Sequence, residues 1–546
     1  MAEPRSAPSA HRDTFARDHL PPRELWPELD FSGLPELAAY PPRLNCAAEL
    51  LDAWVAAGHG ERTALVFPGG RWSYRELLER AGRIAAVLRD DLGLVPGNRV
   101  LLRGPNNPMM AACWFAVLKA GGIVVATMPL LRARELAVIA EKARVRFALT
   151  DARLAGELEQ AAAAAPVLER VARFNAEGPD SLEALMAGRP AEFENVDTAA
   201  DDVALIAFTS GTTGQPKGTM HFHRDVLACC DTFSRHVLRP GADDLFCGSP
   251  PLAFTFGLGG LILFPFRVGA STLLLEQATP PQLLQGIQEF GATVCFTAPT
   301  AYRAMAGVAK DFDLSSLRRC VSAGEALPAA TFELWREATG IEIVDGIGAT
   351  EMLHIFISAS GDDIRPGSTG KAVPGYRATV LDDEGRPAAP GAVGRLAVKG
   401  PTGCRYLDDP ERQRGYVQDG WNLTGDAYRM DADGYFWYQA RTDDMIISSG
   451  YNIAAPEVEN VLLEHPAVLE CAVVGAPDEE RGQVVKAFVV LREGQAAGEA
   501  LVKVLQEFVK SQIAPYKYPR RVEFVASLPR TQTGKLQRFR LREGEG

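Results

Sequence analysis

The sequence has no apolar run long enough to cross a bilayer, and its N-terminus lacks the apolar core of a secretory signal. The longest apolar run, residues 256–266, ends at Arg267. It is well short of the roughly 20 residues that a membrane-spanning helix needs. Residues 1–13, MAEPRSAPSAHRD, are polar and charged and do not form a signal peptide. These absences argue against a membrane protein and against export.

Cysteine is sparse, with nine residues among 546 and no close, metal-like pairing apart from the adjacent Cys229 and Cys230. An odd, scattered set in a large chain is typical of reduced thiols and not of a disulfide scaffold. We therefore expect a cytoplasmic protein. The net charge of −12 gives no general attraction for nucleic acid or an anionic membrane, so neither is expected as a partner.

Two common nucleotide-binding patterns are also missing, the kinase-like phosphate loop and the glycine fingerprint of dinucleotide folds. A different Gly-rich loop is present. Residues 209–218 read TSGTTGQPKG and follow an apolar stretch, residues 203–208, that is typical of a buried strand. Glycine lets the backbone approach a ligand closely, and exposed N–H groups, hydroxyls and a lysine suit a polyphosphate. The residues predicted to bind phosphates are Thr209, Ser210, Gly211, Thr212, Thr213, Gly214 and Lys217.

The order of predicted elements indicates an α/β fold with more than one domain. From about residue 50 to residue 345, helical patterns alternate with short strand-like runs, which predicts mostly parallel sheets layered with helices. Beyond residue 370, short strands and turns predict an antiparallel, barrel-like subdomain. The last hundred residues predict a small α+β domain. We expect an N-terminal domain at residues 1–442 and a C-terminal domain at residues 443–546.

Four further segments carry candidate binding or catalytic groups, although each alone is a weak or moderate signal. Residues 345–351, DGIGATE, offer a hydroxyl for a phosphate oxygen and a carboxylate for Mg²⁺. Residues 322–327, SAGEAL, leave room for a flat ring such as adenine. Residues 424–426, TGD, place a carboxylate that can accept both ribose hydroxyls, with Arg441 further along. Residues 529–535, PRTQTGK, present a lysine on a turn.

In their order along the chain, the segments together resemble the adenylate-forming superfamily, which includes acyl-CoA and aryl-CoA synthetases, and the resemblance covers most of the chain. It implies a two-step reaction. A carboxylate first attacks the α-phosphorus of ATP, giving an acyl-adenylate and pyrophosphate. The small, mobile C-terminal domain then rotates, and a thiol attacks the mixed anhydride. Because two anions must meet in the first step, the site must neutralise charge.

The resemblance implies catalytic roles for three residues. Lys535 would act at the reacting oxygens, Thr350 would bond the α-phosphate, and Glu351 would bind Mg²⁺. Asp443 matches the hinge about which the C-terminal domain swings. Gly450 matches the glycine that lines the pantetheine tunnel, where a side chain would obstruct the thiol.

For the nucleotide, the resemblance implies that Asp345 bonds the adenine amine and that Asp426 and Arg441 bond the ribose. Two positions depart from the superfamily pattern. Ile347 stands where an aromatic residue is usual, and Ala440 stands where a glycine usually precedes the hinge arginine. The other residues predicted to line the nucleotide site are Ala323, Gly324, Glu325, Gly346, Ile347 and Gly348.

Residues 248–260, GSPPLAFTFGLGG, lie where the superfamily builds its acyl pocket, and Phe254 matches the aromatic gate. Flat aromatic walls suit a flat aromatic ring. Any single phenylalanine here is about as often a plain core residue. The residues predicted to line the pocket are Phe254, Thr255, Phe256, Phe264, Gly348, His354 and Ile355.

The runs DGIGATEMLHIF and PLAFTFGLGG resemble the benzoate and 2-aminobenzoate branch of the aryl-CoA ligases. Within that branch, HFHRD, PLAFTFGLGG and GATEM favour 2-aminobenzoate (anthranilate) over plain benzoate. The hydroxyl of Thr255 or the imidazole of His354 can receive an ortho amine, and benzoate is the alternative substrate. His221 and His223 would share one face of a strand. Packing is favoured over metal binding there, because no third ligand lies nearby in sequence.

The core motifs do not separate CoA from a carrier-protein arm as the acceptor, since both end in the same pantetheine thiol. The expected ligands are an aromatic carboxylic acid, ATP, Mg²⁺ and CoA, with a downstream acyl carrier protein or acyltransferase as a further candidate partner. A non-catalytic nucleotide-binding protein is the remaining alternative. The presence of both Lys535 and Glu351 argues against it.

Overall fold

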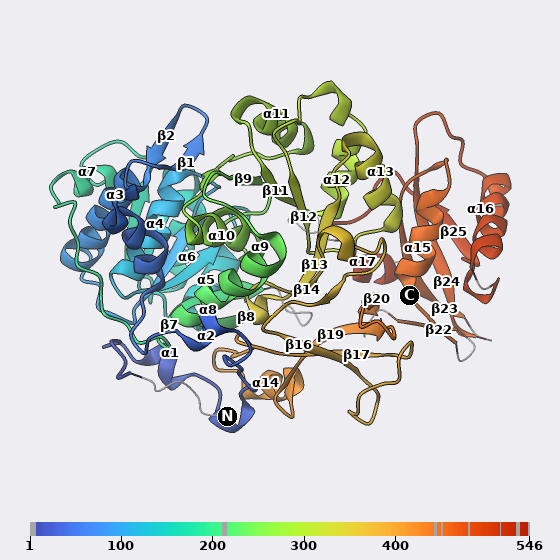
Figure 1. Cartoon of the computed structure of the whole chain (residues 1–546), viewed down its shortest axis with the longest axis horizontal. Coiled ribbons are helices and arrows are strands. Elements are labelled where there is room, and N and C mark those ends of the chain that lie inside the picture. Colours follow the sequence, from blue (N-terminus) through green and yellow to red (C-terminus); the bar gives the residue numbers. More distant parts are fainter. Residues whose placement is uncertain are drawn as a thin grey trace.

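The computed structural model describes residues 7–209, 216–441, 445–448, 451–478, 481–513, 515–530 and 536–543. Within these residues the strands form four sheets, of six, nine, five and five strands. In Figure 1 the two larger sheets and their helices form a main body, and a separate C-terminal unit lies at one end. None of the described helices combines the length and the apolar character that crossing a membrane requires. This is the mixed α/β architecture that the sequence predicts.

The six-stranded sheet is parallel except at one edge, where β7 and β8 are antiparallel. These two strands hold the ends of the 209–218 loop side by side, with Thr209 opposite Lys217. All residues of β3 and β5 are buried, as expected for parallel strands covered on both faces. In spatial order the strands are β6 (Arg170–Phe174), β5 (Phe147–Asp151), β3 (Arg99–Arg103), β4 (Ile123–Thr127), β7 (Val203–Thr209) and β8 (Lys217–Phe222).

The nine-stranded sheet is parallel through its middle and antiparallel at both ends. In spatial order its strands are β15 (Lys371–Ala372), β14 (Ile355–Ser358), β13 (Ile343–Gly348), β12 (Arg319–Ser322), β11 (Val294–Thr297), β9 (Leu245–Gly248), β10 (Ser271–Leu273), β1 (Thr63–Phe67) and β2 (Gly70–Ser73). The candidate segments at residues 322–327 and 345–351 therefore follow neighbouring parallel strands.

Helix α4 (Pro108–Lys119) belongs to the core that the two large sheets share. It begins with proline, the Asn107 side chain accepts from the Met110 N–H at 2.9 Å, and the helix is buried on all sides. The largest hydrophobic cluster joins residues of both sheets, including Leu102 and Phe296. The other main-body α-helices are α1 (Phe15–Asp18), α2 (Pro35–Ala38), α3 (Tyr74–Ala86), α5 (Ala133–Lys142), α6 (Ala155–Ala164), α7 (Leu182–Ala187), α8 (His223–Cys229), α9 (Thr255–Leu258), α10 (Phe264–Arg267), α11 (Pro280–Phe290), α12 (Pro299–Ala306) and α13 (Ala329–Thr339).

The predicted change of texture beyond residue 370 corresponds to a five-stranded antiparallel sheet. Its strands are β16 (Arg377–Leu381), β17 (Val393–Lys399), β18 (Val417–Gln418), β19 (Trp421–Met430) and β20 (Phe436–Arg441), with α14 (Pro410–Tyr416) beside them. Figure 1 shows β16, β17 and β19 along one side of the main body. This sheet supplies Asp426 from β19 and Arg441 from β20.

The C-terminal unit has its own sheet and its own hydrophobic core, which includes Val458, Val473 and Val489. Its strands are β21 (Ile446–Ser448), β22 (Tyr451–Ile453), β23 (Val468–Asp478), β24 (Gly482–Leu491) and β25 (Arg521–Phe524), and its α-helices are α15 (Ala455–Glu464), α16 (Glu499–Gln512) and α17 (Arg538–Glu543). All nine cysteines of the chain are free thiols in the described residues, as the sequence predicts.

A fully buried ion pair lies between the main body and the segment that follows β17. Arg405 and Asp225 are both 0% exposed and contact each other directly. The Arg405 guanidinium also lies 4.0 Å from the centroid of the Phe222 ring. Burial lowers the pKa of Arg405, and the charge of Asp225 is the largest effect in the opposite direction. Because both side chains are fully buried, water cannot replace a partner that is removed. Loss of either charge would leave the other buried and unpaired, which lowers the stability of the fold.

Replacing Arg405 with methionine should destabilise the protein by about 3–5 kcal/mol, because Asp225 would remain buried without its counter-charge. The matched control is Arg386→Met. The Arg386 side chain is 71% exposed and pairs with Asp382 and Glu384, so its loss should cost less than about 1 kcal/mol. Urea unfolding followed by tryptophan fluorescence measures both. Equal, small shifts for the two variants would contradict the importance of the buried pair.

Candidate active site

The predicted binding segments meet where strands of the two large sheets end. β7 ends at Thr209, β12 ends at Ser322, and β13 runs through Asp345 to Gly348. Ser322 and Asp345 are paired across neighbouring strands. The carboxyl ends of parallel strands are the usual position of ligand sites in α/β sheets. Residues 210–215 of the predicted phosphate loop lie outside the described residues.

Lys217, Glu351 and Tyr406 form a contact that joins these segments. Lys217 begins β8, and its Nζ lies 2.9 Å from Oε1 of Glu351. The Tyr406 hydroxyl donates to the same oxygen at 2.6 Å. Burial acts to raise the pKa of Glu351, but the Lys217 charge and the two hydrogen bonds outweigh it, so the pKa lies below its ordinary value. Glu351 is therefore an ionised carboxylate in a nearly closed site.

Thr350 begins the short helix η9 (Thr350–Met352), and His221 holds its backbone. The Nε2 of His221 lies 2.7 Å from the Thr350 carbonyl oxygen. Burial lowers the pKa of His221 to about 4, so the neutral ring donates this hydrogen bond. His221 lies in β8 whereas His223 is the first residue of α8, so the expectation that both lie in one strand is wrong. Among the described residues, no three His, Cys, Asp or Glu side chains are placed to hold a metal ion.

Asp345 carries a carboxylate oxygen, Oδ1, that is buried and has no hydrogen-bond partner among the described residues. Burial raises the pKa of Asp345 to about 7, against smaller opposing effects from the Gly346 backbone and Ser322. A buried acceptor without a partner is costly to maintain. Such a group fits a site that receives a hydrogen bond from a ligand.

Asp426 and Arg441 face each other across β19 and β20, as the sequence prediction of a shared role requires. Nη1 of Arg441 lies 3.0 Å from Oδ1 of Asp426 and 3.1 Å from the Thr424 carbonyl oxygen. Burial raises the pKa of Asp426, and the neighbouring Arg441 charge opposes this shift. The structure thus brings both predicted ribose-binding residues to one place.

Ala323, Gly324 and Glu325 follow β12 directly. Ala323 is buried, and Gly324 has φ = 91°, which favours glycine. Oε1 of Glu325 lies 3.4 Å from Nη1 of Arg530, which belongs to the C-terminal unit. The predicted adenine loop therefore also touches that unit.

His354 lies within a cluster of phenylalanine rings. Its centroid is 4.5 Å from that of Phe264 and 5.7 Å from those of Phe256 and Phe233. Phe296 completes the cluster, 5.6 Å from Phe256 and 6.1 Å from Phe264. The structure brings the predicted residues Phe256, Phe264 and His354 together. The sequence analysis missed Phe233 and Phe296.

The His354 imidazole is only 3% exposed, and neither ring nitrogen has a hydrogen-bond partner among the described residues. Burial lowers the pKa of His354 to about 3, so the ring is neutral. The backbone of Phe256 has a smaller effect that raises the pKa of His354, but it does not lie in hydrogen-bond geometry with either ring nitrogen. A Cβ atom at Gly259 would lie 2.5 Å from Nε2, so only glycine leaves room for the ring there.

The remaining predicted pocket residues surround this cluster. Thr255 is the first residue of α9 and Phe254 its N-cap, and both are half-buried. Ile355 is buried in β14, opposite Gly348. A Cβ atom at Gly348 would lie 2.8 Å from the His354 carbonyl oxygen, so glycine permits the close approach of β13 and β14. Three predicted nucleotide residues lie in the same strand as Gly348, namely Asp345, Gly346 and Ile347.

The structure describes none of the three site residues that the sequence predicts in the C-terminal domain. Asp443, Gly450 and Lys535 lie outside the described residues. On either side of residues 531–535, Arg530 and Leu536 form an antiparallel bridge.

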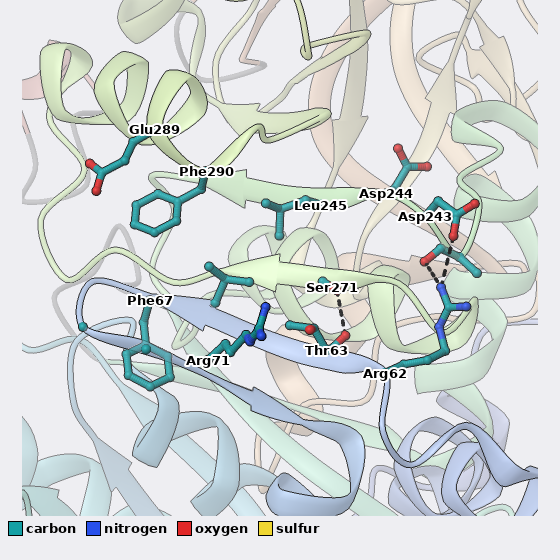
Figure 2. Close-up of a pocket in the computed structure, with 14 residues that line it drawn as sticks. Arg62, Thr63, Phe67, Arg71, Asp243, Asp244, Leu245, Ser271, Glu289 and Phe290 are labelled. Carbon is teal, nitrogen blue, oxygen red and sulfur yellow. Dashed lines mark hydrogen bonds and ion pairs between the residues drawn. The ribbon is translucent and has the colours of Figure 1, made fainter.

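A groove of about 770 Å³ lies away from all of these residues, between the β1–β2 hairpin and the end of α11 (Figure 2). Arg62 crosses it to the Ala242 carbonyl oxygen at 2.5 Å and to Asp243 at 3.3 Å, and Phe67, Arg71 and Glu289 also line it. None of the predicted site residues lies in its walls. Hollow shape alone therefore does not locate the candidate active site.

Comparison with known proteins agrees with this geometry. The family description "AMP-binding enzyme" matches residues 52–405, and "AMP-binding enzyme C-terminal domain" matches residues 457–535. The chain belongs to the AMP-binding enzyme family. The benzoate–CoA ligase of Thauera aromatica is 37% identical over 519 residues, which cover 94% of this chain and 98% of that protein. Members of this family include AMP-forming acid–CoA ligases, and the chain is an enzyme of that class.

Two solved structures are also similar. The anthranilate CoA ligase AuaEII, in complex with anthranoyl-AMP, has a TM-score of 0.89 and 36% sequence identity, and covers 93% of this chain and 98% of its own. A benzoate CoA ligase from Burkholderia xenovorans LB400 has a TM-score of 0.84 and 33% identity, and covers 91% of this chain and 100% of its own. More than nine tenths of the chain therefore shares the fold of these two aryl-CoA ligases.

The pKa of Asp345 gives a prediction for stability. The carboxyl titrates near 7 in the folded protein and near 3.8 when unfolded, so burying its charge costs stability as the pH rises between these values. Asp345→Asn has no such charge. The unfolding free energy of Asp345→Asn minus that of the wild type should therefore rise by roughly 1–3 kcal/mol as the pH goes from 4 to 8. Urea unfolding of both proteins at several pH values measures this, and a constant difference would contradict the buried, perturbed carboxyl.

Proposed function

We propose that the protein activates 2-aminobenzoate (anthranilate) with ATP and transfers the aryl group to CoA. The ligase class follows from the family, and the choice of acid is our inference. The single observation that carries it is the His354 imidazole, which is buried and neutral and has no hydrogen-bond partner among the described residues. The ring of the acid would lie against the phenylalanines around His354, and an ortho amine would donate to the unprotonated imidazole nitrogen. Thr255 is the second candidate acceptor.

In the first step, a carboxylate oxygen of the acid attacks the α-phosphorus, and the bond from that phosphorus to the pyrophosphate leaving group breaks. The proposed phosphate loop, residues 209–214, would bind the phosphates with its N–H groups and hydroxyls. Oγ1 of Thr209 is buried without a partner among the described residues, which suits a phosphate ligand. Lys217 would lower the negative charge, Thr350 would bond the α-phosphate, and Lys535 would stabilise the reacting oxygens.

Glu351 fits the proposed Mg²⁺ site. Its pKa is held below the ordinary value, and both Lys217 and Tyr406 contact the same oxygen, Oε1. Mg²⁺ is commonly held by one or two carboxylates together with substrate phosphates and waters, so a single carboxylate suffices. When bound, the ion would screen the negative charge of the phosphates.

The adenosine would lie along the edge formed by the ends of β12 and β13. Asp345 would accept from the adenine amine through its buried oxygen. Asp426 would accept from the ribose hydroxyls, supported by Arg441 at 3.0 Å. The ring would lie against the loop after β12 and the end of β13, namely Ala323, Gly324, Glu325, Gly346, Ile347 and Gly348.

In the second step, the thiol sulfur attacks the carbonyl carbon, AMP leaves, and the thiol proton passes to solvent. We propose that residues 1–442 form one domain and residues 443–546 a second one that rotates about Asp443 between the steps. Gly450 would then line the path of the pantetheine arm. CoA is the proposed acceptor, and a carrier-protein arm is the alternative.

The substrate choice gives a quantitative prediction. Wild type should prefer 2-aminobenzoate to benzoate by about tenfold or more in kcat/KM for aryl-CoA formation, since one buried hydrogen bond is worth about 1–3 kcal/mol. His354→Leu should reduce this ratio to near one, mainly through a loss for 2-aminobenzoate. The matched control is His465→Leu in the C-terminal unit, which should keep the wild-type ratio.

Benzoate is the second candidate, because two similar proteins carry that name. A large preference of the wild type for benzoate would contradict the choice of 2-aminobenzoate. Including 4-aminobenzoate in the panel shows whether the amine is recognised at the ortho position. Supplying free CoA or a phosphopantetheinylated carrier protein as the acceptor decides between the two thiols.

A further inference from the structure

Arg530 connects the C-terminal unit with the main body. It directly precedes residues 531–535 in the chain. Its Nη2 is 2.8 Å from Oε2 of Glu470 in β23, within the same unit. Its Nη1 is 3.4 Å from Oε1 of Glu325, in the loop after β12 of the main body. One guanidinium therefore spans two carboxylates that belong to different parts of the molecule.

Neighbouring contacts place this connection within an interface. The Nε–H of Arg303, in α12, donates at 3.2 Å to the carbonyl oxygen of Leu469, the residue before Glu470. Helices α13 and α15 also pack against each other. In Figure 1, α12 and α13 form the side of the main body that faces the C-terminal unit. The side chains of Arg530 and Glu325 are 27% and 19% exposed, so the ion pair is partly shielded from solvent.

The position of Arg530 in the chain links this contact to the chemistry. Arg530 and Leu536 form an antiparallel bridge, and the Gln537 N–H donates to the Pro529 carbonyl oxygen at 2.9 Å. The two ends of the segment that contains Lys535 are thus held together. Because Glu325 belongs to the proposed adenine loop, a bond from Arg530 to Glu325 brings the start of this segment to the proposed nucleotide site.

We infer that Arg530 is a positioning residue for aryl-AMP formation, and this rests on the proposed function. By bridging Glu470 and Glu325, it stabilises this orientation of the C-terminal unit against the main body while aryl-AMP forms. The bridge must open when the unit rotates for thioester formation. A partly exposed ion pair is weak, which suits a contact that is made and broken in each turnover.

The test separates the two half-reactions. Arg530→Met should slow single-turnover formation of aryl-AMP in the absence of CoA by about three- to tenfold, with KM for ATP changed less than twofold. Formation of aryl-CoA from supplied aryl-AMP should change less than twofold. Added salt should slow aryl-AMP formation in wild type more than in Arg530→Met, because salt screens the ion pair.

Exchanging the charges of Arg530 and Glu325 tests whether Glu325 is the partner through which Arg530 acts. Arg530→Glu should slow aryl-AMP formation further than Arg530→Met, because it faces Glu325 with a like charge. Adding Glu325→Arg to Arg530→Glu should restore at least half of the lost rate. The control is Lys510→Met, which removes a cation from α16 on the far side of the C-terminal unit (Figure 1) and should leave both half-reactions unchanged.

The possible outcomes distinguish the inference from the proposed function. Equal slowing of both half-reactions by Arg530→Met, or no recovery in the charge-exchanged variant, would overturn the inference. Lys535→Ala should lose far more of the aryl-AMP rate than Arg530→Met. Normal aryl-AMP formation by Lys535→Ala would contradict the proposed function itself. A slow Lys535→Ala beside a normal Arg530→Met would contradict only the role of Arg530.

Discussion

The contact between Lys217 and Glu351 is the interaction on which the arrangement of the site depends. Lys217 begins the strand that returns from the phosphate loop of one sheet, and Glu351 follows the last parallel strand of the other. Their 2.9 Å contact, with Tyr406 on the same oxygen, joins the two sheets where their strands end. Opposite charges must lie together here without a ligand, since each would be costly to bury alone. The proposed chemistry uses the same charges, one toward the phosphates and one toward Mg²⁺.

Much of the fold and of the site could be predicted from the sequence because both follow local rules. An apolar stretch ending in TSGTTGQPKG indicates a buried strand followed by a loop, and β7 ends at Thr209. Asp426 and Arg441 could be assigned a common role, and the register of β19 and β20 pairs them. Predictions of position succeed when strand order and turn chemistry fix where a side chain lies, while the roles of these residues stay predictions.

The rest depends on contacts between distant segments that carry no local signal. Tyr406 reaches Glu351, and Phe233 and Phe296 enclose His354, although no motif marks any of the three. The pair of histidines was wrongly assigned to one strand because the chain enters α8 directly after Phe222. The isolation of the His354 imidazole is likewise a property of packing, since it requires that no neighbouring residue supply a partner.

The central claim is that these separate segments neutralise the repulsion between an organic anion and ATP for long enough to form an acid–AMP bond. ATP–pyrophosphate exchange in the absence of CoA measures that bond most directly. We predict that exchange requires an added aromatic carboxylate and Mg²⁺, and that Lys217→Met, which leaves Glu351 without its counter-charge, reduces it by about 100-fold or more. Absence of exchange with every acid in a panel of substituted benzoates, or exchange unaffected by Lys217→Met, would contradict the claim.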